Sequence, residues 1–205
     1  ALLFKVFETT SVLPGPAAWI AVRLYDKPGS GTRPIGHLPF FYRLWAKCRQ
    51  PLAAKWEQQN DCDFLAASKG RRVTDPVWRQ AVRDSDAKQK CEQIINATAD
   101  FKKFYETIEW EQLIGRALAK GYPEQLAHAA VAMYRCARYI IYANMAAEPV
   151  GARCGMVAGD SLATSLVKGY YIEAFWSYSR RWPGAELDVY IDDVNLALRG
   201  TARQL

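Results

Sequence analysis

Histidine and paired cysteine are the scarcest chemical features of this chain of 205 residues. It has two histidines, His37 and His128, and five cysteines, none of which forms a C-x-x-C pair. An odd, scattered set of cysteines far from histidine argues against a zinc site and against a disulfide framework, and it favours buried free thiols in a reducing compartment. His128 lies in an Ala-rich helical stretch, so we expect it to be packed or exposed and assign it no role.

Long apolar runs, internal repeats and low-complexity tracts are also missing. No apolar stretch approaches the roughly 18 residues that cross a bilayer, so we expect no membrane partner. Hydrophobic residues make up 50% and charged residues 23% of the chain, which excludes a disordered or collagen-like protein. The chain runs from Ala1 to Leu205, stops soon after a predicted strand and is long enough for one real core, and we expect a fragment of a longer protein.

Positive charge is concentrated in one segment. The chain carries 27 Lys and Arg against 21 Asp and Glu, a net charge of +6. Between residues 23 and 55 there is one acid, Asp26, and the following basic residues: Arg23, Lys27, Arg33, Arg43, Lys47, Arg49 and Lys55. Such a segment suits a polyanion, either nucleic acid or a triphosphate. The plainer alternative is a solvated basic face.

Turn residues and apolar periodicity predict an α+β fold. The expected helices cover 40–59, 109–120, 123 to about 140, a stretch from Thr74-Asp75-Pro76 onward and a stretch from Asp160 onward. The expected strands form a hairpin over 18–35, a buried strand that ends at Asp100, and two short strands over 187–191 and 194–198. This order suits a small antiparallel sheet with packed helices and excludes a Rossmann alternation.

Two adjacent carboxylates, Asp192 and Asp193, lie between the last two predicted strands. Like charges at close range repel each other, and hairpin turns normally use Asn-Gly or Asp-Gly instead. A divalent cation would relieve this repulsion, and hard oxygen ligands suit magnesium. The alternative is a solvated turn that happens to hold two acids.

Asp100 supplies a third carboxylate at the predicted end of a buried strand. Three carboxylates from neighbouring strands can hold two metal ions about 4 Å apart. Such a pair activates a hydroxyl and stabilises the leaving oxygen of a phosphoryl displacement. The alternative for Asp100 is the N-cap of a helix that starts near Lys102.

Taken together, these motifs resemble the reverse transcriptase family, in particular its non-LTR and group II intron members. Tyr190-Ile191-Asp192-Asp193 resembles the Y-x-D-D box, and Asp100 followed five residues later by Tyr105 resembles the first catalytic box. Arg33-Pro34-Ile35 is similar to the fingers signature. The segment from Gly155 to Leu162 lies where the G-x-x-Q-G-x-x-x-S box belongs. All four boxes occur in the family's order, over about residues 20 to 200.

The resemblance implies a catalytic and metal-binding role for three acids, Asp100, Asp192 and Asp193. It implies two magnesium ions as cofactors, with manganese as an alternative. For substrate binding it implies Arg33 and Lys27 at the triphosphate and Tyr105 as the residue that discriminates deoxyribose from ribose. It also implies that Gly155 and Gly159 allow close backbone approach to the template–nucleotide pair, and that Tyr190 lies near the primer terminus.

The same resemblance implies an organisation and a set of partners. We expect a fingers-like region with the basic segment over 1–90 and a ferredoxin-like palm over 91–205, truncated before the thumb. The partners would be an RNA template, a DNA primer and deoxynucleoside triphosphates, with no obligate protein partner evident. The sequence does not identify the compartment, and both nucleus and cytoplasm are compatible with it.

Two positions depart from the family pattern. Ala158 stands where the family has Gln, and Ala163 stands at the later Ser position, so placement of template and nucleotide is affected. One alternative is therefore a degenerate retroelement copy that binds nucleic acid without catalysis. Another is an RNA-directed RNA polymerase, against which Tyr190 and Tyr105 argue, because its boxes commonly read Gly-Asp-Asp and carry a second Asp. An unrelated α+β domain is the last.

Overall fold

The chain divides into two compact units, each built from two segments. The structure is a computed structural model, and it describes residues 2–29 and 31–201. Unit 1 comprises Ala1–Trp56 and Lys103–Tyr170, and unit 2 comprises Glu57–Lys102 and Tyr171–Leu205. Two long helices, α2 (Phe40–Gln59) and α7 (Ala163–Arg181), begin in unit 1 and end in unit 2. The division into fingers over 1–90 and palm over 91–205 stays a prediction.

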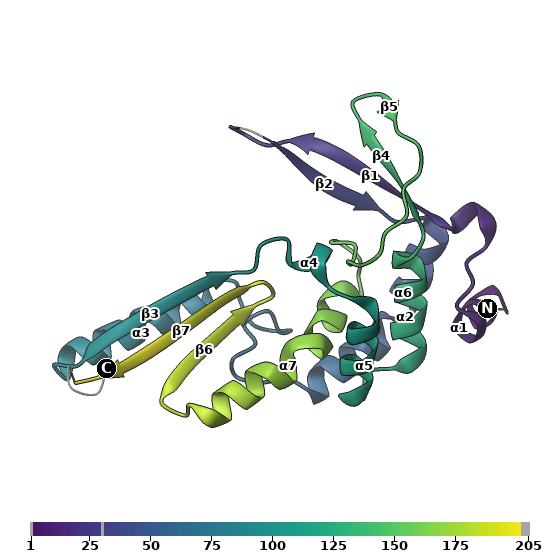
Figure 1. The fold of residues 1–205 in the computed structure, drawn as a ribbon. Coiled ribbons are helices and arrows are strands. Elements are labelled where there is room, and N and C mark those ends of the chain that lie inside the picture. Colours follow the sequence, from purple (N-terminus) through teal and green to yellow (C-terminus); the bar gives the residue numbers. More distant parts are fainter. Residues whose placement is uncertain (1, 30, 202–205) are drawn as a thin grey trace. The chain divides into compact units, whose positions relative to one another are not determined.

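Unit 1 contains a four-stranded sheet in the order β2-β1-β4-β5 (Figure 1). Its strands are β1 (Trp19–Asp26), β2 (Thr32–His37), β4 (Ala137–Tyr142) and β5 (Met145–Ala146). The predicted hairpin is confirmed, because β1 and β2 pair antiparallel with Tyr25 opposite Arg33. β1 also pairs with β4, in parallel.

The helices of unit 1 enclose an aromatic core. They are α1 (Leu2–Thr10), the 3-10 turn η1 (Gly15–Ala17), most of α2, α4 (Phe104–Thr107), α5 (Trp110–Ala119), α6 (Glu124–Tyr134) and the start of α7. Phe7 of α1 meets Trp45 of α2 edge-on, with ring centroids 4.9 Å apart, and both are buried. The bounds predicted for α2 are confirmed. Gly121 has φ +70°, so it ends α5 in the left-handed conformation that its position predicts.

The predicted helix over 123 to about 140 is wrong in its last third. α6 ends at Tyr134, and Ala137–Tyr142 form strand β4 instead. The segment Tyr139-Ile140-Ile141-Tyr142 is aromatic and β-branched, which suits a pleated surface better than a helix. Its pairing partner is β1, more than 100 residues earlier, with Val22 opposite Ile140. A partner so distant in sequence leaves no local signal.

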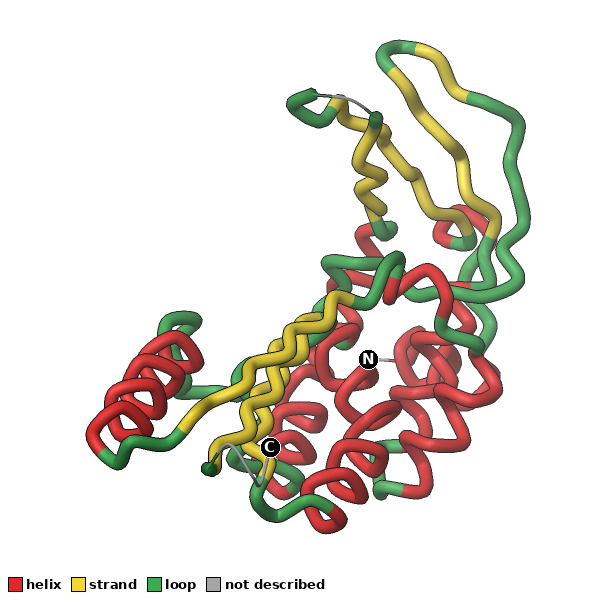
Figure 2. Tube along the Cα trace, turned by 60° about the vertical axis from the view of Figure 1, so that its left-hand side comes forward, coloured by secondary structure: helices red, strands yellow, loops and turns green. Residues whose placement is uncertain are grey.

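Unit 2 contains a three-stranded antiparallel sheet in the order β3-β7-β6, whose strands run side by side in Figure 2. The strands are β3 (Gln93–Asp100), β6 (Ala185–Tyr190) and β7 (Asp193–Gly200). The β6–β7 hairpin was predicted and is confirmed. Helix α3 (Asp75–Gln89), which starts where Thr74-Asp75-Pro76 predicts, and the end of α7 complete the unit.

The expectation that the strand ending at Asp100 is buried is wrong. Of the eight residues of β3, only Ile94 is even half-buried. β3 is an edge strand with one neighbour, β7, and the β6 edge is instead bridged by the segment at Leu65, which pairs with Val189. The alternation of small and polar side chains in Asn96-Ala97-Thr98-Ala99 fits this exposure.

The α+β class expected from the sequence is confirmed, with one antiparallel and one mixed sheet. The expectation that the free thiols are buried is wrong, because Cys48 and Cys91 are exposed and the other three cysteines are half-buried. Across residues 2–29 and 31–201, no helix combines the length and the apolar character that a membrane crossing requires.

Candidate active site

The residues predicted to form the site are divided between the two units. Unit 2 holds the three acids and Tyr190, whereas unit 1 holds the predicted substrate-binding residues Lys27, Arg33, Tyr105, Gly155 and Gly159. Each group is described within its own unit below.

The sheet of unit 2 brings the backbones of the three acids together. Asp100, the last residue of β3, lies directly opposite Asp193, the first residue of β7. The backbone N–H of Phe101 donates to the carbonyl oxygen of Asp192 at 3.3 Å. Residues directly opposite each other in an antiparallel pair have Cβ atoms roughly 4.5–5.5 Å apart. Strand register therefore holds the three positions at one end of the sheet.

Tyr190 completes a row across all three strands. It lies opposite Asp193 in the β6–β7 pair, so Asp100, Asp193 and Tyr190 occupy one line on one face of the sheet. The chain reverses between Tyr190 and Asp193 through a two-residue turn, Ile191-Asp192, in which Ile191 has φ +60°. Buried Val189 and Val194 form the neighbouring row and fix this register from the apolar face.

The donor set has the hard carboxylate oxygens that magnesium prefers. The side chains of Asp100 and Asp193 are exposed, and that of Asp192 is half-buried. Within the part of the chain that the structure describes, however, no three His, Cys, Asp or Glu side chains form a group able to hold a metal ion. The backbone positions thus fit a carboxylate site, whereas the side-chain orientations do not form one.

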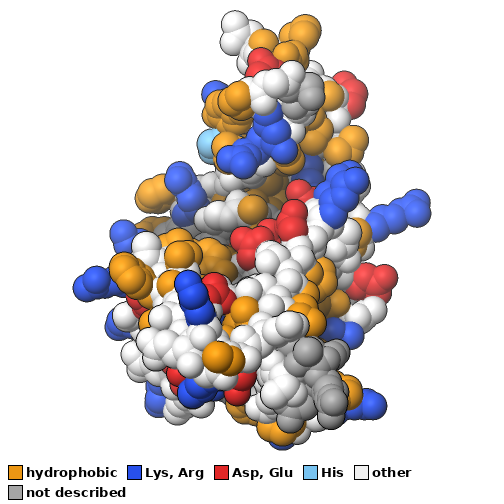
Figure 3. Space-filling view, turned by 90° about the vertical axis from the view of Figure 1, so that its left-hand side faces the viewer, with side chains coloured by type: hydrophobic (Ala, Val, Ile, Leu, Met, Phe, Trp, Pro, Cys, Tyr) orange, Lys and Arg blue, Asp and Glu red, His pale blue; other side chains and the backbone are white. Residues whose placement is uncertain are grey.

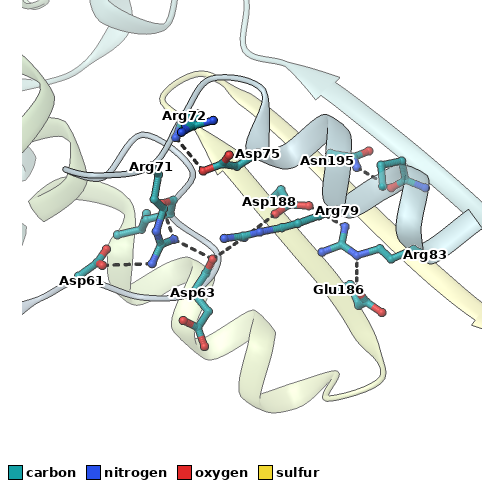
Figure 4. A network of polar contacts seen from close by, with 12 residues as sticks. Asp61, Asp63, Arg71, Arg72, Asp75, Arg79, Arg83, Glu186, Asp188 and Asn195 are labelled. Carbon is teal, nitrogen blue, oxygen red and sulfur yellow. Dashed lines mark hydrogen bonds and ion pairs between the residues drawn. The ribbon is translucent and has the colours of Figure 1, made fainter. Parts of the chain in front are cut away.

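An ionic network beside this row fastens helix α3 to the sheet (Figure 4). Asp188 of β6 is 2% exposed and accepts hydrogen bonds from Arg79 at 3.1 Å and from Arg83 at 2.6 Å. Arg83 also pairs with Glu186, and Arg79 donates to the carbonyl oxygen of Asp63 at 2.8 Å. The sequence analysis did not predict a role for these residues. Two arginines four positions apart lie on the same side of a helix, and this spacing could have indicated a shared acidic partner.

The network reaches the row next to the three acids. Asn195 lies opposite both Thr98 and Asp188, two positions from Asp193 along β7. Its side-chain amide donates to Gln80 of α3 at 3.3 Å, and the hydroxyl of Thr98 donates to its side-chain oxygen at 3.3 Å. Polar contacts from α3 therefore support the polar face of the sheet one row away from the carboxylates.

In unit 1, the basic hairpin presents Lys27 and Arg33 to solvent. The backbone N–H of Lys27 donates to the carbonyl oxygen of Gly31 at 3.0 Å, which closes the loop. Gly29 and Gly31 have φ +101° and +81°, so this loop needs residues without a Cβ. Figure 3 shows several Lys and Arg side chains on the upper part of the face in view. An exposed basic hairpin can meet a phosphate-bearing ligand.

One member of the basic segment is engaged within the protein. Arg49 of α2 forms an ion pair with Glu8 of α1, and the indole N–H of Trp45 donates to the same carboxylate at 2.8 Å. The hydrogen bond from Arg49 lowers the pKa of Glu8. The other six basic residues of the segment are exposed.

Tyr105 belongs to the predicted first catalytic box, and Gly155 begins the box that runs to Leu162. Backbone hydrogen bonds join these two boxes within unit 1. The N–H of Met156 donates to the carbonyl oxygen of Tyr105 at 2.7 Å, and that of Gly155 to Ile108 at 2.8 Å. Gly155 has φ +92°, and a Cβ there would lie 2.9 Å from the carbonyl oxygen of Glu106. Glycine is thus required here by a close approach within the protein itself.

Gly159 and Ala158 lie in an open part of the same segment. Gly159 has φ +91°, but no heavy atom within 4 Å would meet a Cβ added there. Both residues are exposed. The space beside Gly159 is therefore open, and its role in substrate binding stays a prediction.

Asp160, expected to begin a helix, is instead a buried acceptor three residues before α7. Its carboxylate accepts hydrogen bonds from the hydroxyls of Tyr42 at 2.8 Å and Tyr134 at 2.5 Å, and from the N–H of Leu162 at 3.3 Å. Burial raises the pKa of Asp160, and burial beside that carboxyl also raises the pKa of both tyrosines. This contact fixes the segment that follows Gly155 and Gly159 to the core.

Comparison with known proteins gives this geometry a context. Residues 25–205 match the family model described as "Reverse transcriptase (RNA-dependent DNA polymerase)". Among solved structures, the chain is similar to the apo telomerase of Candida tropicalis truncated from its C-terminal domain, with a TM-score of 0.61 and 12% identity, over 96% of this chain and 48% of that one. It thus spans about half the length of that telomerase chain, and the likeness supports the fingers–palm fold.

The search of curated proteins found no match. Because the family model covers most of its length, the chain belongs to the reverse transcriptase family.

Proposed function

We propose that this chain is the RNA-directed DNA polymerase domain of a retroelement of the non-LTR or group II intron kind, acting by two-metal nucleotidyl transfer. The observation that carries the proposal is the register of unit 2, which holds Asp100 opposite Asp193 beside Asp192. That arrangement occurs in a chain of the reverse transcriptase family.

The three acids are the proposed catalytic residues. Asp100, Asp192 and Asp193 would hold magnesium, with manganese as an alternative. A bound metal pair would stabilise the charge on the attacking and leaving oxygens of the transfer. Because Asp100 and Asp193 are already in register, these two carboxylates would reach one cation without a strand shift.

The remaining predicted residues would bind substrates. We propose that Arg33 and Lys27 bind the triphosphate, where a guanidinium offers paired donors to phosphate oxygens. Tyr105 would lie under the sugar and Tyr190 near the primer terminus. The last two, Gly155 and Gly159, would line the path of the template–nucleotide pair. An RNA template, a DNA primer and deoxynucleoside triphosphates are the proposed partners, with residues 1–90 as fingers and 91–205 as palm.

A non-catalytic protein that only binds nucleic acid is the second candidate. It is favoured by Ala158 and Ala163, which replace the Gln and Ser of the family pattern.

The test is primer extension on an RNA template by the protein in its full chain, with magnesium or manganese. Asp192→Asn should lower extension at least about a hundredfold, the scale of losing one group that stabilises transition-state charge. The matched control is Asp84→Asn, which changes an exposed acid of α3 and should leave extension unchanged. Affinity for template–primer should be the same in both variants.

Three outcomes would contradict the proposal. Equal extension by Asp192→Asn and wild type would remove Asp192 from the mechanism. Tight template–primer binding without extension by the wild-type protein would support the non-catalytic candidate. Extension only with ribonucleotides would indicate an RNA polymerase.

A further inference from the structure

The segment between Gly155 and helix α7 carries one buried acid. Asp160 is 6% exposed, whereas its neighbours Ala158, Gly159 and Ser161 are exposed. A buried carboxylate needs hydrogen bonds or a charged partner, because burial disfavours its ionised form. The hydrogen bonds of Asp160 therefore identify the parts of the protein that this side chain holds in place.

The two oxygens of this carboxylate bind different parts of unit 1. Oδ2 accepts from the hydroxyl of Tyr42 in α2 at 2.8 Å and from that of Tyr134, the last residue of α6, at 2.5 Å. Oδ1 accepts from the backbone N–H of Leu162 at 3.3 Å. Both tyrosines are fully buried. We define the Asp160 bracket as these three side chains, Tyr42, Tyr134 and Asp160, which join two helices to the backbone before α7.

The backbone around Asp160 closes a turn on the same residue. The N–H of Asp160 donates to the carbonyl oxygen of Val157 at 3.2 Å, and the N–H of Ala163 donates to the carbonyl oxygen of Asp160 at 3.1 Å. Ala158 and Gly159 are the two residues between Val157 and Asp160. Because the turn is hydrogen-bonded on both sides of Asp160, the bracket fixes the place of these two exposed residues.

This turn lacks the two polar side chains of the family pattern. Ala158 stands in place of Gln and Ala163 in place of Ser, and the side chain of alanine neither donates nor accepts a hydrogen bond. The bracket reaches the turn from the core instead. It leaves the outer surface of the turn open, since a Cβ added at Gly159 would meet no heavy atom within 4 Å.

We propose that the Asp160 bracket positions the exposed surface of Ala158 and Gly159 for the template–nucleotide pair. This role rests on the proposed function, because that function places the pair at Gly159. Tyr42, Tyr134 and Asp160 act from within the core as positioning residues and touch no substrate. They supply, from beneath the turn, part of the placement that Gln and Ser provide in the family pattern.

Tyr42→Phe and Tyr134→Phe, the two bracket variants, test this role because each removes one hydroxyl and keeps the ring. The matched control is Tyr122→Phe. Tyr122 is 2% exposed in the same unit, and its hydroxyl lies 2.9 Å from that of Ser165 in α7, outside the bracket. Each of the three variants removes a buried hydroxyl that is hydrogen-bonded to another side chain, so a purely structural role predicts similar effects in all of them.

Hydrogen exchange of the full-chain protein tests the bracket without any activity. The amides of Asp160, Leu162 and Ala163 donate within the turn. They should exchange at least about tenfold faster in both bracket variants than in wild type, because hydrogen bonds to a charged group are the stronger kind. Their rates in Tyr122→Phe should stay close to those of wild type.

Primer extension on an RNA template tests the role at the nucleotide. The KM for the deoxynucleoside triphosphate should rise at least about tenfold in both bracket variants, because small misplacements of a binding surface have effects of this order or larger. The kcat at saturating nucleotide should change by less than about threefold, as expected when binding alone is weakened. Tyr122→Phe should keep the wild-type KM.

Three results would overturn the proposal. Equal exchange rates in the bracket variants and in Tyr122→Phe would remove the bracket as the support of the turn. Faster exchange in the bracket variants with an unchanged KM, or an equal rise of KM in Tyr122→Phe, would leave the network a structural role alone. Absence of extension by the wild-type protein would overturn the proposed function and with it the role at the nucleotide, whereas the exchange rates would still decide the bracket.

Discussion

The buried carboxylate of Asp188 should be the main anchor between α3 and the sheet of unit 2. Asp188→Asn keeps the volume and one acceptor oxygen but removes the charge. The variant exchanges two charge-assisted hydrogen bonds, each worth about 2 kcal/mol, for one neutral bond of about 1 kcal/mol. Arg79 is a third exposed, so its share is screened and most of the effect comes from Arg83. With the Arg79 share discounted by about half, we expect a loss of about 2 kcal/mol in the stability of unit 2.

Hydrogen exchange under native conditions measures this loss in the right place. Amides of β6 and β7 should exchange about thirtyfold faster in Asp188→Asn, while amides of unit 1 keep their rates. The control is Glu173→Gln, because Glu173 and Arg180 form an exposed pair whose removal should change the free energy of opening by under about 0.5 kcal/mol. A loss below about 1 kcal/mol for Asp188→Asn, or equal losses in both units, would refute the reasoning.

The remaining predictions concern unit 1. Because burial raises the folded pKa of Asp160, this group's full contribution to stability is present below the ordinary carboxyl pKa and is lost as pH rises through the folded value. Asp160→Asn should therefore flatten the dependence of the unfolding free energy on pH, and an unchanged slope would contradict this. Gly159→Ala should lower the free energy of unfolding by about 1 kcal/mol, because of the positive φ at this position. Gly155→Ala should lower it by at least about 2 kcal/mol more, because the added methyl also meets the carbonyl of Glu106. Urea unfolding measures both losses, and equal losses would refute the clash. Tyr105→Val should raise ribonucleotide over deoxyribonucleotide incorporation in single-nucleotide assays, and an unchanged ratio with lower stability would make Tyr105 structural.

The sequence predicted those elements whose turns, caps or periodicity depend on nearby residues. The glycine loop after β1 predicted the hairpin, the apolar periodicity of α2 predicted its bounds, and Thr74-Asp75-Pro76 predicted the start of α3. The Tyr190–Asp193 motif also predicted the turn of the last hairpin. Each of these depends on residues within a few positions of one another.

Features that depend on distant partners could not be predicted in the same way. β4 pairs with β1 across more than 100 residues, so its segment was assigned to a helix. Asp160 meets Tyr42, 118 positions away, and nothing in its own surroundings marked it as buried. The burial of β3 was overestimated because Ile94 and Ile95 suggested a core strand, whereas an edge position decides exposure.

The turn at the candidate site stores backbone strain. Ile191, at its first central position, has φ +60°, which favours glycine and is costly for a β-branched side chain by about 1–2 kcal/mol. The paired strands β6 and β7 hold this conformation on both sides. Ile191→Gly should therefore stabilise the β6–β7 hairpin by about 1 kcal/mol. Hydrogen exchange of the amides that flank the turn measures this gain, and slower exchange in the wild type than in the variant would contradict it. At this position the chain gives up stability to keep a bulky side chain next to its two acids, the pattern expected where backbone strain persists at functional sites.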